Sequence, residues 1–269
     1  MGVTLRMGAD YSIDMSDFDF NASELPSAYI SQYNSTTIVG YADGVKVTIK
    51  GAGFTYGSSG ITGGEIQSIS ETWDGETLFS LTGLQLSVKS ILSVVESGSI
   101  SEAKKLLTSA LSGADDMFGG QYSDTLYGFG GNDYLAGGRG DDALSGGSGV
   151  DRLQGGLGAD TLFGGTGNDT FVYTSATQSS ARLGLDTIRD LTIGDKIDLS
   201  GIDASVSATG NQAFSFIGTA TFHGKAGELR FEKKASDTYI YGDVNGDKVA
   251  DFALHLDDAV TLSKGFFAL

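Results

Sequence analysis

A run of nine-residue repeats in the middle of the chain constrains its fold more than any other feature. Seven apolar residues recur nine positions apart without an insertion, and an aspartate stands two positions before each of them. The apolar residues are Met117, Leu126, Leu135, Leu144, Leu153, Leu162 and Phe171, and the aspartates are Asp115, Asp124, Asp133, Asp142, Asp151, Asp160 and Asp169. A fixed short period predicts a solenoid, in which each repeat is stable only when stacked on its neighbours.

Glycines fill most of the first four positions, which gives the template G-G-x-G-x-D-x-U-x, where U is apolar. Seven matches in phase are specific, whereas a single glycine-aspartate pair is an ordinary turn. Glycine is needed where the turn visits positive φ and where stacked backbones approach closely. We expect six residues of each repeat to form a turn and three a strand. Two repeats would then complete one coil of a right-handed parallel β-roll, with the apolar residue inside.

The aspartates predict a site for hard cations. Turns on one side of the roll belong to alternate repeats, so their carboxylates lie about 4.8 Å apart and repel by roughly 3.5 kcal/mol at an effective dielectric near 20. Calcium binds carboxylate and carbonyl oxygens, and these turns offer both. We therefore expect about five Ca²⁺ ions between alternate repeats, which would change the net charge from −17 to about −7. Folding of the roll should depend on this binding.

Charge and composition narrow the partners. The formal net charge of −17 argues against nucleic acid or an anionic membrane and favours cations or basic surfaces. No apolar run is long enough to span a bilayer. The first twenty residues contain no apolar region of the kind found in a cleaved signal peptide, and the absence of cysteine suits export in an unfolded state. We expect a secreted protein that uses another export signal.

The repeats divide the chain into three parts. Residues 1–112 are expected to form a β-rich module with two short helices that cap the roll, 113–172 the roll, and 173–269 a C-terminal β domain. In the first part, 36–41, 45–50, 54–56, 65–72 and 77–82 are predicted strands with turns at 42–44 and 74–75, and 1–34 give only a weak signal. Helices are expected at 87–95 and 103–111, the second opened by a capping box from Ser99 to Glu102.

The third part continues the repeat pattern before changing to mixed strands. Gly184-Leu185-Asp186-Thr187-Ile188 repeats the G-x-D-x-U core after an insertion, and it predicts one further irregular turn. Segments 214–217, 227–231, 238–241 and 250–256 are expected to form a short antiparallel β unit.

The repeats resemble the RTX family of haemolysin-type calcium-binding proteins. The segments Asp186-Thr187-Ile188-Arg189-Asp190-Leu191 and Gly194-Asp195-Lys196-Ile197-Asp198-Leu199-Ser200 are similar to the C-terminal domain of serralysin-type metalloproteases. The resemblance covers about 110–269. It implies a parallel β-roll, export by the type I secretion machinery and an uncleaved secretion signal near 266–269. The acidic residue that often precedes the final apolar group is replaced here by Lys264-Gly265.

The resemblance also implies a ligand scheme. Each ion would take carbonyls at positions two and four and the aspartate of one repeat, with positions one and three and the aspartate of the repeat after next. The clearest sites combine Gly138, Gly140 and Asp142 with Gly155, Leu157 and Asp160, and Gly147, Gly149 and Asp151 with Gly164, Thr166 and Asp169. The remaining candidate ligands are Gly113, Asp115, Gly120, Tyr122, Asp124, Gly128, Phe129, Gly130, Gly131, Asp133, Gly137, Arg139, Gly146, Ser148, Gly156, Gly158, Gly165, Gly167 and Asp186. Tyr122 and Leu111 depart from the template.

Other motifs offer weaker alternatives. The chain has no HExxH or GxSxG motif, and His223 and His255 are expected to be surface or core residues and not ligands. The carboxylates Asp43, Glu65, Glu71, Asp74 and Glu76 are expected on a solvated face, and Trp73 in the core. Asp243-Val244-Asn245-Gly246-Asp247, with Asp251, has the spacing of a calcium loop but lacks the glutamate at position twelve, so a plain turn is the alternative.

These observations predict a secreted calcium-binding RTX protein without catalytic activity. Residues 1–112 would form a surface or adhesion module that contacts a polysaccharide or a host surface. The alternative is a secreted enzyme acting on polysaccharide, with a site in 1–112 that no motif locates.

Overall fold

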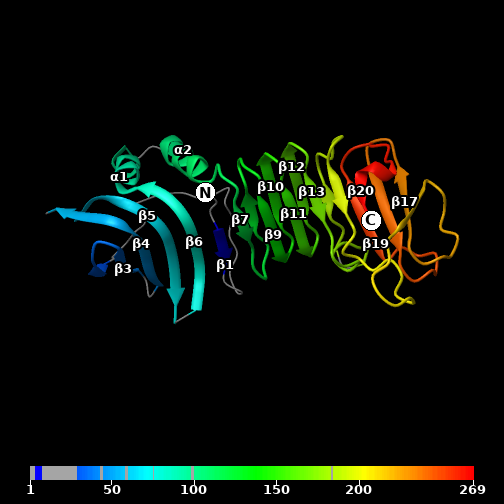
Figure 1. Ribbon diagram of the computed structural model, residues 1–269, viewed down its shortest axis with the longest axis horizontal. Helices are drawn as coiled ribbons and strands as arrows, with labels where there is room; N and C mark the ends of the chain where they lie inside the picture. The colour runs from blue at the N-terminus through cyan, green and yellow to red at the C-terminus, as the bar shows by residue number, and fades with distance from the viewer. Residues whose placement is uncertain are drawn as a thin grey trace.

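The computed structural model describes residues 4–7, 29–42, 45–57, 60–74, 76–97, 100–182 and 184–269. They form an elongated, mainly β molecule in which the N-terminal sheet, the repeats and the C-terminal strands follow one another along the long axis (Figure 1). Two sheets organise the described strands. The first has the order β2-β3-β4-β5-β6-β1-β7-β9-β11-β13-β15-β20, and the second β16-β17-β18-β19-β14-β12-β10-β8.

The repeats form the predicted parallel roll. Its strands are β7 (Asp116–Phe118), β8 (Thr125–Tyr127), β9 (Tyr134–Arg139), β10 (Ala143–Ser148), β11 (Arg152–Leu157), β12 (Thr161–Thr166) and β13 (Thr170–Val172). Successive strands alternate between the two sheets, and residues eighteen apart are paired, as in Leu135 with Leu153 and Leu144 with Leu162. Two repeats per coil are therefore confirmed. The expected three-residue strands are too short, because β9 to β12 continue through the glycines, which also pair between coils.

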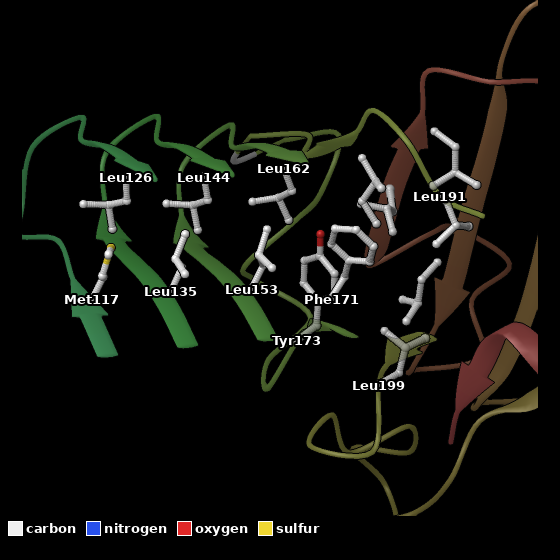
Figure 2. Close-up of a cluster of buried hydrophobic side chains, with 14 of the residues drawn as sticks. Met117, Leu126, Leu135, Leu144, Leu153, Leu162, Phe171, Tyr173, Leu191 and Leu199 are labelled. Carbon is white, nitrogen blue, oxygen red and sulfur yellow. The ribbon is translucent and has the colours of Figure 1, made fainter. Parts of the chain in front are cut away.

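The apolar position of each repeat points into the roll, as expected. Met117, Leu126, Leu135, Leu153 and Leu162 are fully buried, and Leu144 is 1% exposed. Figure 2 shows their side chains in two facing rows that continue into Phe171 and Tyr173. Because the roll is only two side chains thick, each of these residues supplies a large share of the local core.

Leu144→Ala is expected to lower the free energy of unfolding of the calcium-loaded protein by about 2–5 kcal/mol, since it leaves a cavity in a fully buried row. Urea denaturation at saturating calcium measures the change. Val150→Ala is the control, because Val150 is 51% exposed in a turn of the same roll, and it should change stability by less than about 0.5 kcal/mol. Equal effects of the two substitutions would contradict the packing argument.

The N-terminal strands form a continuation of the roll's first sheet. They are β1 (Thr4–Met7), β2 (Tyr29–Tyr33), β3 (Thr37–Ala42), β4 (Val45–Gly57), β5 (Gly60–Trp73) and β6 (Glu76–Ser87). β1 pairs antiparallel with β6 and parallel with β7, so it joins the N-terminal sheet to the first coil. The sequence pattern missed β1 and β2, and it divided β4 into two strands. The predicted turn residues 43, 44 and 75 lie outside the described residues.

Two helices follow β6. They are α1 (Val88–Ser97) and α2 (Ile100–Ala110). The backbone N–H of Ser90 donates to Ser87 Oγ at 3.0 Å, which caps the start of α1, while Ser99 of the predicted capping box lies outside the described residues. Leu107 and Leu111 pack in the shared core. At the edge of the first sheet it is β1, and not a helix, that adjoins β7.

The C-terminal strands extend both sheets. They are β14 (Thr187–Ile188), β15 (Lys196–Asp198), β16 (Ser215–Gly218), β17 (Glu228–Lys233), β18 (Thr238–Asp243), β19 (Phe252–Leu256) and β20 (Phe267–Ala268), with the 3₁₀ helix η3 (Lys264–Phe266). β14 pairs parallel with β12, which confirms the irregular turn predicted at Asp186.

The expected separate antiparallel unit needs correction. Only β17, β18 and β19 pair antiparallel, while β16 pairs parallel with β17. β19 also pairs parallel with β14, and β20 pairs parallel with β15. The C-terminal region is therefore part of the two roll sheets, because its edge strands extend the existing hydrogen-bond ladders.

Candidate metal centre

The repeat aspartates form two buried ladders, one on each side of the roll. In each step the backbone N–H of one aspartate donates to Oδ1 of the aspartate one coil further on. Examples are Asp124 to Asp142 at 2.7 Å and Asp133 to Asp151 at 2.8 Å. The aspartates of the seven repeats are all 2% exposed or less. The nine-residue period thus places one carboxylate oxygen in each turn on a backbone donor of the previous turn.

The second oxygen of most ladder carboxylates has no hydrogen-bond partner. These atoms are Oδ2 of Asp133, Asp142, Asp151, Asp160, Asp169 and Asp186. A buried charged oxygen without a partner is strongly unfavourable, and native proteins pair such atoms or bind a metal with them. Six of them in register define an arrangement that requires cations.

The space beside each unpaired oxygen suits an ion. The point that a Cβ on Gly128 would occupy lies 2.4 Å from Asp133 Oδ2 and 2.4 Å from the Gly146 carbonyl oxygen of the next coil. The corresponding point beside Gly146 lies 2.4 Å from Asp151 Oδ2 and 2.7 Å from the Gly164 oxygen. Ca²⁺–oxygen bonds are about 2.3–2.6 Å long. Glycine at position one therefore leaves open a space with carboxylate and carbonyl oxygens at calcium-binding distance.

Burial opposes ionisation of these carboxylates in the absence of a cation. It raises the pKa of Asp142 to about 8, where the neighbouring carboxylates of Asp160 and Asp124 add to the effect and the hydrogen bond from Asp124 opposes it. Burial likewise raises the pKa of Asp186 to about 8 and that of Asp133 to about 7. A divalent cation would offset the cost of the ionised form.

Without calcium, the stability of the folded roll is expected to fall as the pH rises from 5 to 8. Carboxyls with a folded pKa of about 7 or 8 and an unfolded pKa of about 3.9 bind more protons when folded, so their stabilisation is lost as they ionise. With saturating calcium the trend should reverse, because protons then compete with the metal. Urea unfolding at several pH values, with EDTA and with calcium, measures both slopes, and parallel slopes would contradict the assignment.

The first turn on one side differs from the regular ones. The backbone N–H of Gly120 donates to Asp124 Oδ2 at 2.7 Å, so this oxygen already has a donor. Tyr122, in place of the fourth glycine, is not among the described residues with positive φ, whereas Phe129 adopts a φ of 64° at position two of the next turn. The departure of Tyr122 from the template thus coincides with a changed turn.

The carbonyls of the implied ligand scheme lie in the turns, between consecutive coils. Those at position three also accept hydrogen bonds from the previous coil, as in Gly140 N–H to Leu157 O and Gly149 N–H to Thr166 O, both at 2.9 Å. A carbonyl has two lone pairs, so this bond is compatible with a further metal contact. The residue-by-residue ligand scheme stays a prediction.

The structure adds two residues that the sequence analysis did not include. Asp195 Oδ1 accepts the Asp169 N–H at 2.9 Å and so continues one ladder. Asp190 accepts the N–H groups of Gly164 and Gly165 at 2.9 and 2.8 Å. Asp195 stands two residues before the buried Ile197, a D-x-U signal that matches the repeats, but the shortened Gly194-Asp195 spacing breaks the template.

The suggested calcium loop at Asp243 is satisfied by its own backbone. Asp243 Oδ1 accepts the Gly246 N–H at 2.6 Å and Oδ2 the Lys248 N–H at 2.9 Å, while Asp251 Oδ2 accepts the Val244 N–H at 2.9 Å. These contacts account for the buried Asp243 as a turn residue.

The N-terminal carboxylates form no pair along β5. Glu65 and Glu71 lie six residues apart on this strand, a separation of about 20 Å, whereas glycosidase carboxylates lie about 5–9.5 Å apart. Asp74 follows β5 in a turn with φ of 48°. Asp43 lies outside the described residues.

A comparison with protein families matches residues 116–266 to the C-terminal domain of peptidase M10, serralysin. The match covers more than half of the chain. The chain belongs to this serralysin C-terminal family. Its RTX-type repeats bind calcium, and the aspartate ladders of this chain fit that property.

Two solved structures are similar to part of the chain. They are the AlgE6R2 and AlgE6R3 subunits of the Azotobacter vinelandii mannuronan C5-epimerase. The first has 28% identity and a TM-score of 0.41, and the similarity covers 56% of this chain and 91% of the subunit. The second has 26% identity and a TM-score of 0.29, with 58% and 78% covered. A search of curated proteins found no match. Among the described residues, no helix has the length and apolar character needed to cross a membrane.

Proposed function

We propose that this serralysin-family chain is a secreted protein that binds about five Ca²⁺ ions in its roll and folds as they bind, after export by the type I secretion machinery. The observation that carries the proposal is the set of six buried Oδ2 atoms without hydrogen-bond partners. Ionised at neutral pH, they would destabilise the roll. Low calcium inside the cell and high calcium outside would keep the chain unfolded for export and fold it afterwards.

We further propose that residues 1–112 are a noncatalytic module that contacts a polysaccharide or a host surface. One face of its sheet is apolar, with Ile49, Ile69 and Leu81 in one cross-strand row. The next row carries the hydroxyl residues Thr48, Ser70 and Ser80. Because side chains alternate along a strand, these hydroxyls are on the opposite face, where they can hydrogen bond to sugars or polar protein groups.

Binding and turnover measurements on the calcium-loaded full chain test this role. A glycan array and a hydrolase screen should show binding without turnover, and Thr48→Val with Ser70→Ala should reduce binding about tenfold or more, the loss of one to two hydrogen bonds. Thr221→Val, at an exposed C-terminal position, is the control. Turnover of any glycan would favour a polysaccharide-active enzyme, and binding unchanged in the double variant would exclude this face.

A further inference from the structure

A second group of metal-ligating side chains lies outside the roll, where β18 and β19 extend the second sheet. Asp237, His255 and Asp257 each offer one ligand atom, and these three atoms lie within 4.8 Å of one another. The group combines an imidazole with two carboxylates, and all three residues are half-buried. It differs in kind from the all-oxygen turns of the roll.

Neighbouring residues hold the imidazole in place. His255 Nε2 lies 3.0 Å from Asp237 Oδ1, and Nδ1 lies 3.1 Å from Thr187 Oγ1 on the adjacent strand β14. The ring of Tyr239 stacks on the imidazole with centroids 4.9 Å apart and planes at 22°. Metal-binding histidines are commonly oriented by such a contact to the second ring nitrogen. Here Thr187 directs Nε2 towards the two carboxylates.

The strand pairing explains why these residues meet. Tyr239 on β18 and Thr187 on β14 are both cross-strand partners of His255. Asp237 directly precedes β18, and Asp257 directly follows β19. Since antiparallel β18 begins beside the end of β19, the two carboxylates converge on the same end of the sheet as His255.

We propose that Asp237, His255 and Asp257 bind one divalent transition-metal ion of the zinc class. Zn²⁺ accepts imidazole nitrogen and carboxylate oxygen at about 2.0–2.2 Å, which in a tetrahedral site places ligand atoms about 3.3 Å apart. The separation of 3.0 Å between Nε2 and Oδ1 is close to that value. Calcium prefers oxygen ligands alone, so the imidazole separates this site from the roll. Three protein ligands leave a coordination position for water.

The local charges are compatible with an ion. Arg189 pairs with Asp257 Oδ2, and Lys234 lies over the Tyr239 ring at 4.3 Å, so two cations stand beside two carboxylates and the imidazole. A metal ion would replace the proton that Nε2 shares with Asp237. Arg189 would remain as a support for Asp257, which fixes that carboxylate at the edge of the site.

Zinc titration of the full chain tests the proposal, with calcium held in large excess so that the roll is saturated. Isothermal titration calorimetry should show one tight Zn²⁺ site, and Co²⁺ should give the visible absorption of a low-symmetry site. His255→Gln should weaken binding about a hundredfold. Thr187→Val should weaken it about tenfold, as expected for a residue that orients a ligand.

His223→Gln is the matched control, because His223 is the other histidine of the chain and pairs with Glu228 at 2.8 Å. This variant should bind zinc as tightly as the unmodified chain. Asp237→Asn provides a second ligand variant if His255→Gln fails to fold. Absence of a zinc site in the calcium-loaded chain, or binding retained in both ligand variants, would show that the three residues form an ion-pair network only.

Discussion

Addition of EDTA at pH 7.5 is expected to remove most of the β-sheet signal of the purified chain. About five ions, each present at a hundred times its Kd, would stabilise the fold by about 13 kcal/mol, which is comparable with the whole stability of a typical domain. Removal of the ions also leaves buried carboxylates such as Asp142 and Asp160 facing each other without compensation. Far-UV circular dichroism before and after chelation measures the loss.

The extent of unfolding provides a more specific test. Because β1 pairs with both β6 and β7, hydrogen exchange should show that β6 loses protection together with the roll. Magnesium is the control ion, because it prefers a smaller octahedral site, and it should restore much less structure than calcium. A spectrum unchanged by EDTA in protein shown to be free of calcium would contradict calcium-dependent folding.

Asp142→Asn is expected to have opposite effects on the calcium-free and calcium-loaded proteins. Asparagine keeps an oxygen that can accept the Asp124 N–H bond but removes a buried charge. Since burial raises the pKa of Asp142 to about 8, the calcium-free roll should become more stable at pH 8. Calcium affinity should fall by about tenfold or more at the adjoining sites, because one anionic ligand is lost. Urea unfolding with EDTA and calcium titration calorimetry measure the two effects.

Asp141→Asn is the matched control for this substitution. Asp141 is the exposed neighbour of Asp142 in the same turn, and its Oδ1 accepts the Ala159 N–H at 2.8 Å. Asparagine preserves that acceptor, so both calcium affinity and calcium-free stability should change little. If Asp142→Asn destabilised the calcium-free protein as well, the carboxylate would have a structural role other than metal binding.

Much of the roll and its candidate site could be predicted from the sequence, because their contacts repeat at one separation. Residues eighteen apart pair throughout the regular coils, so a single nine-residue pattern determines the buried row, the aspartate ladder and the stacking of the turns. Asp186 was also predicted, since its G-x-D-x-U context survives the insertion before it. Asp195 was missed because its glycine stands one position too close.

The contacts that the sequence did not reveal join residues at irregular separations. β1 is a four-residue strand whose position between β6 and β7 depends on partners far along the chain, and short strands have little periodicity of their own. His255 was expected to be an isolated histidine, yet it meets Thr187 across 68 positions and Asp237 across 18.

The sequence by itself thus determined the calcium-binding roll, since neighbouring coils read the same period and every repeat reports the same environment. Only the tertiary structure decided where the roll ends, with β1 added at one edge and β20 at the other, and which side chains from the C-terminal strands converge. The physical reason is that a repeated local contact leaves a period in the chain, whereas a contact made once, between strands brought together by the whole fold, leaves none.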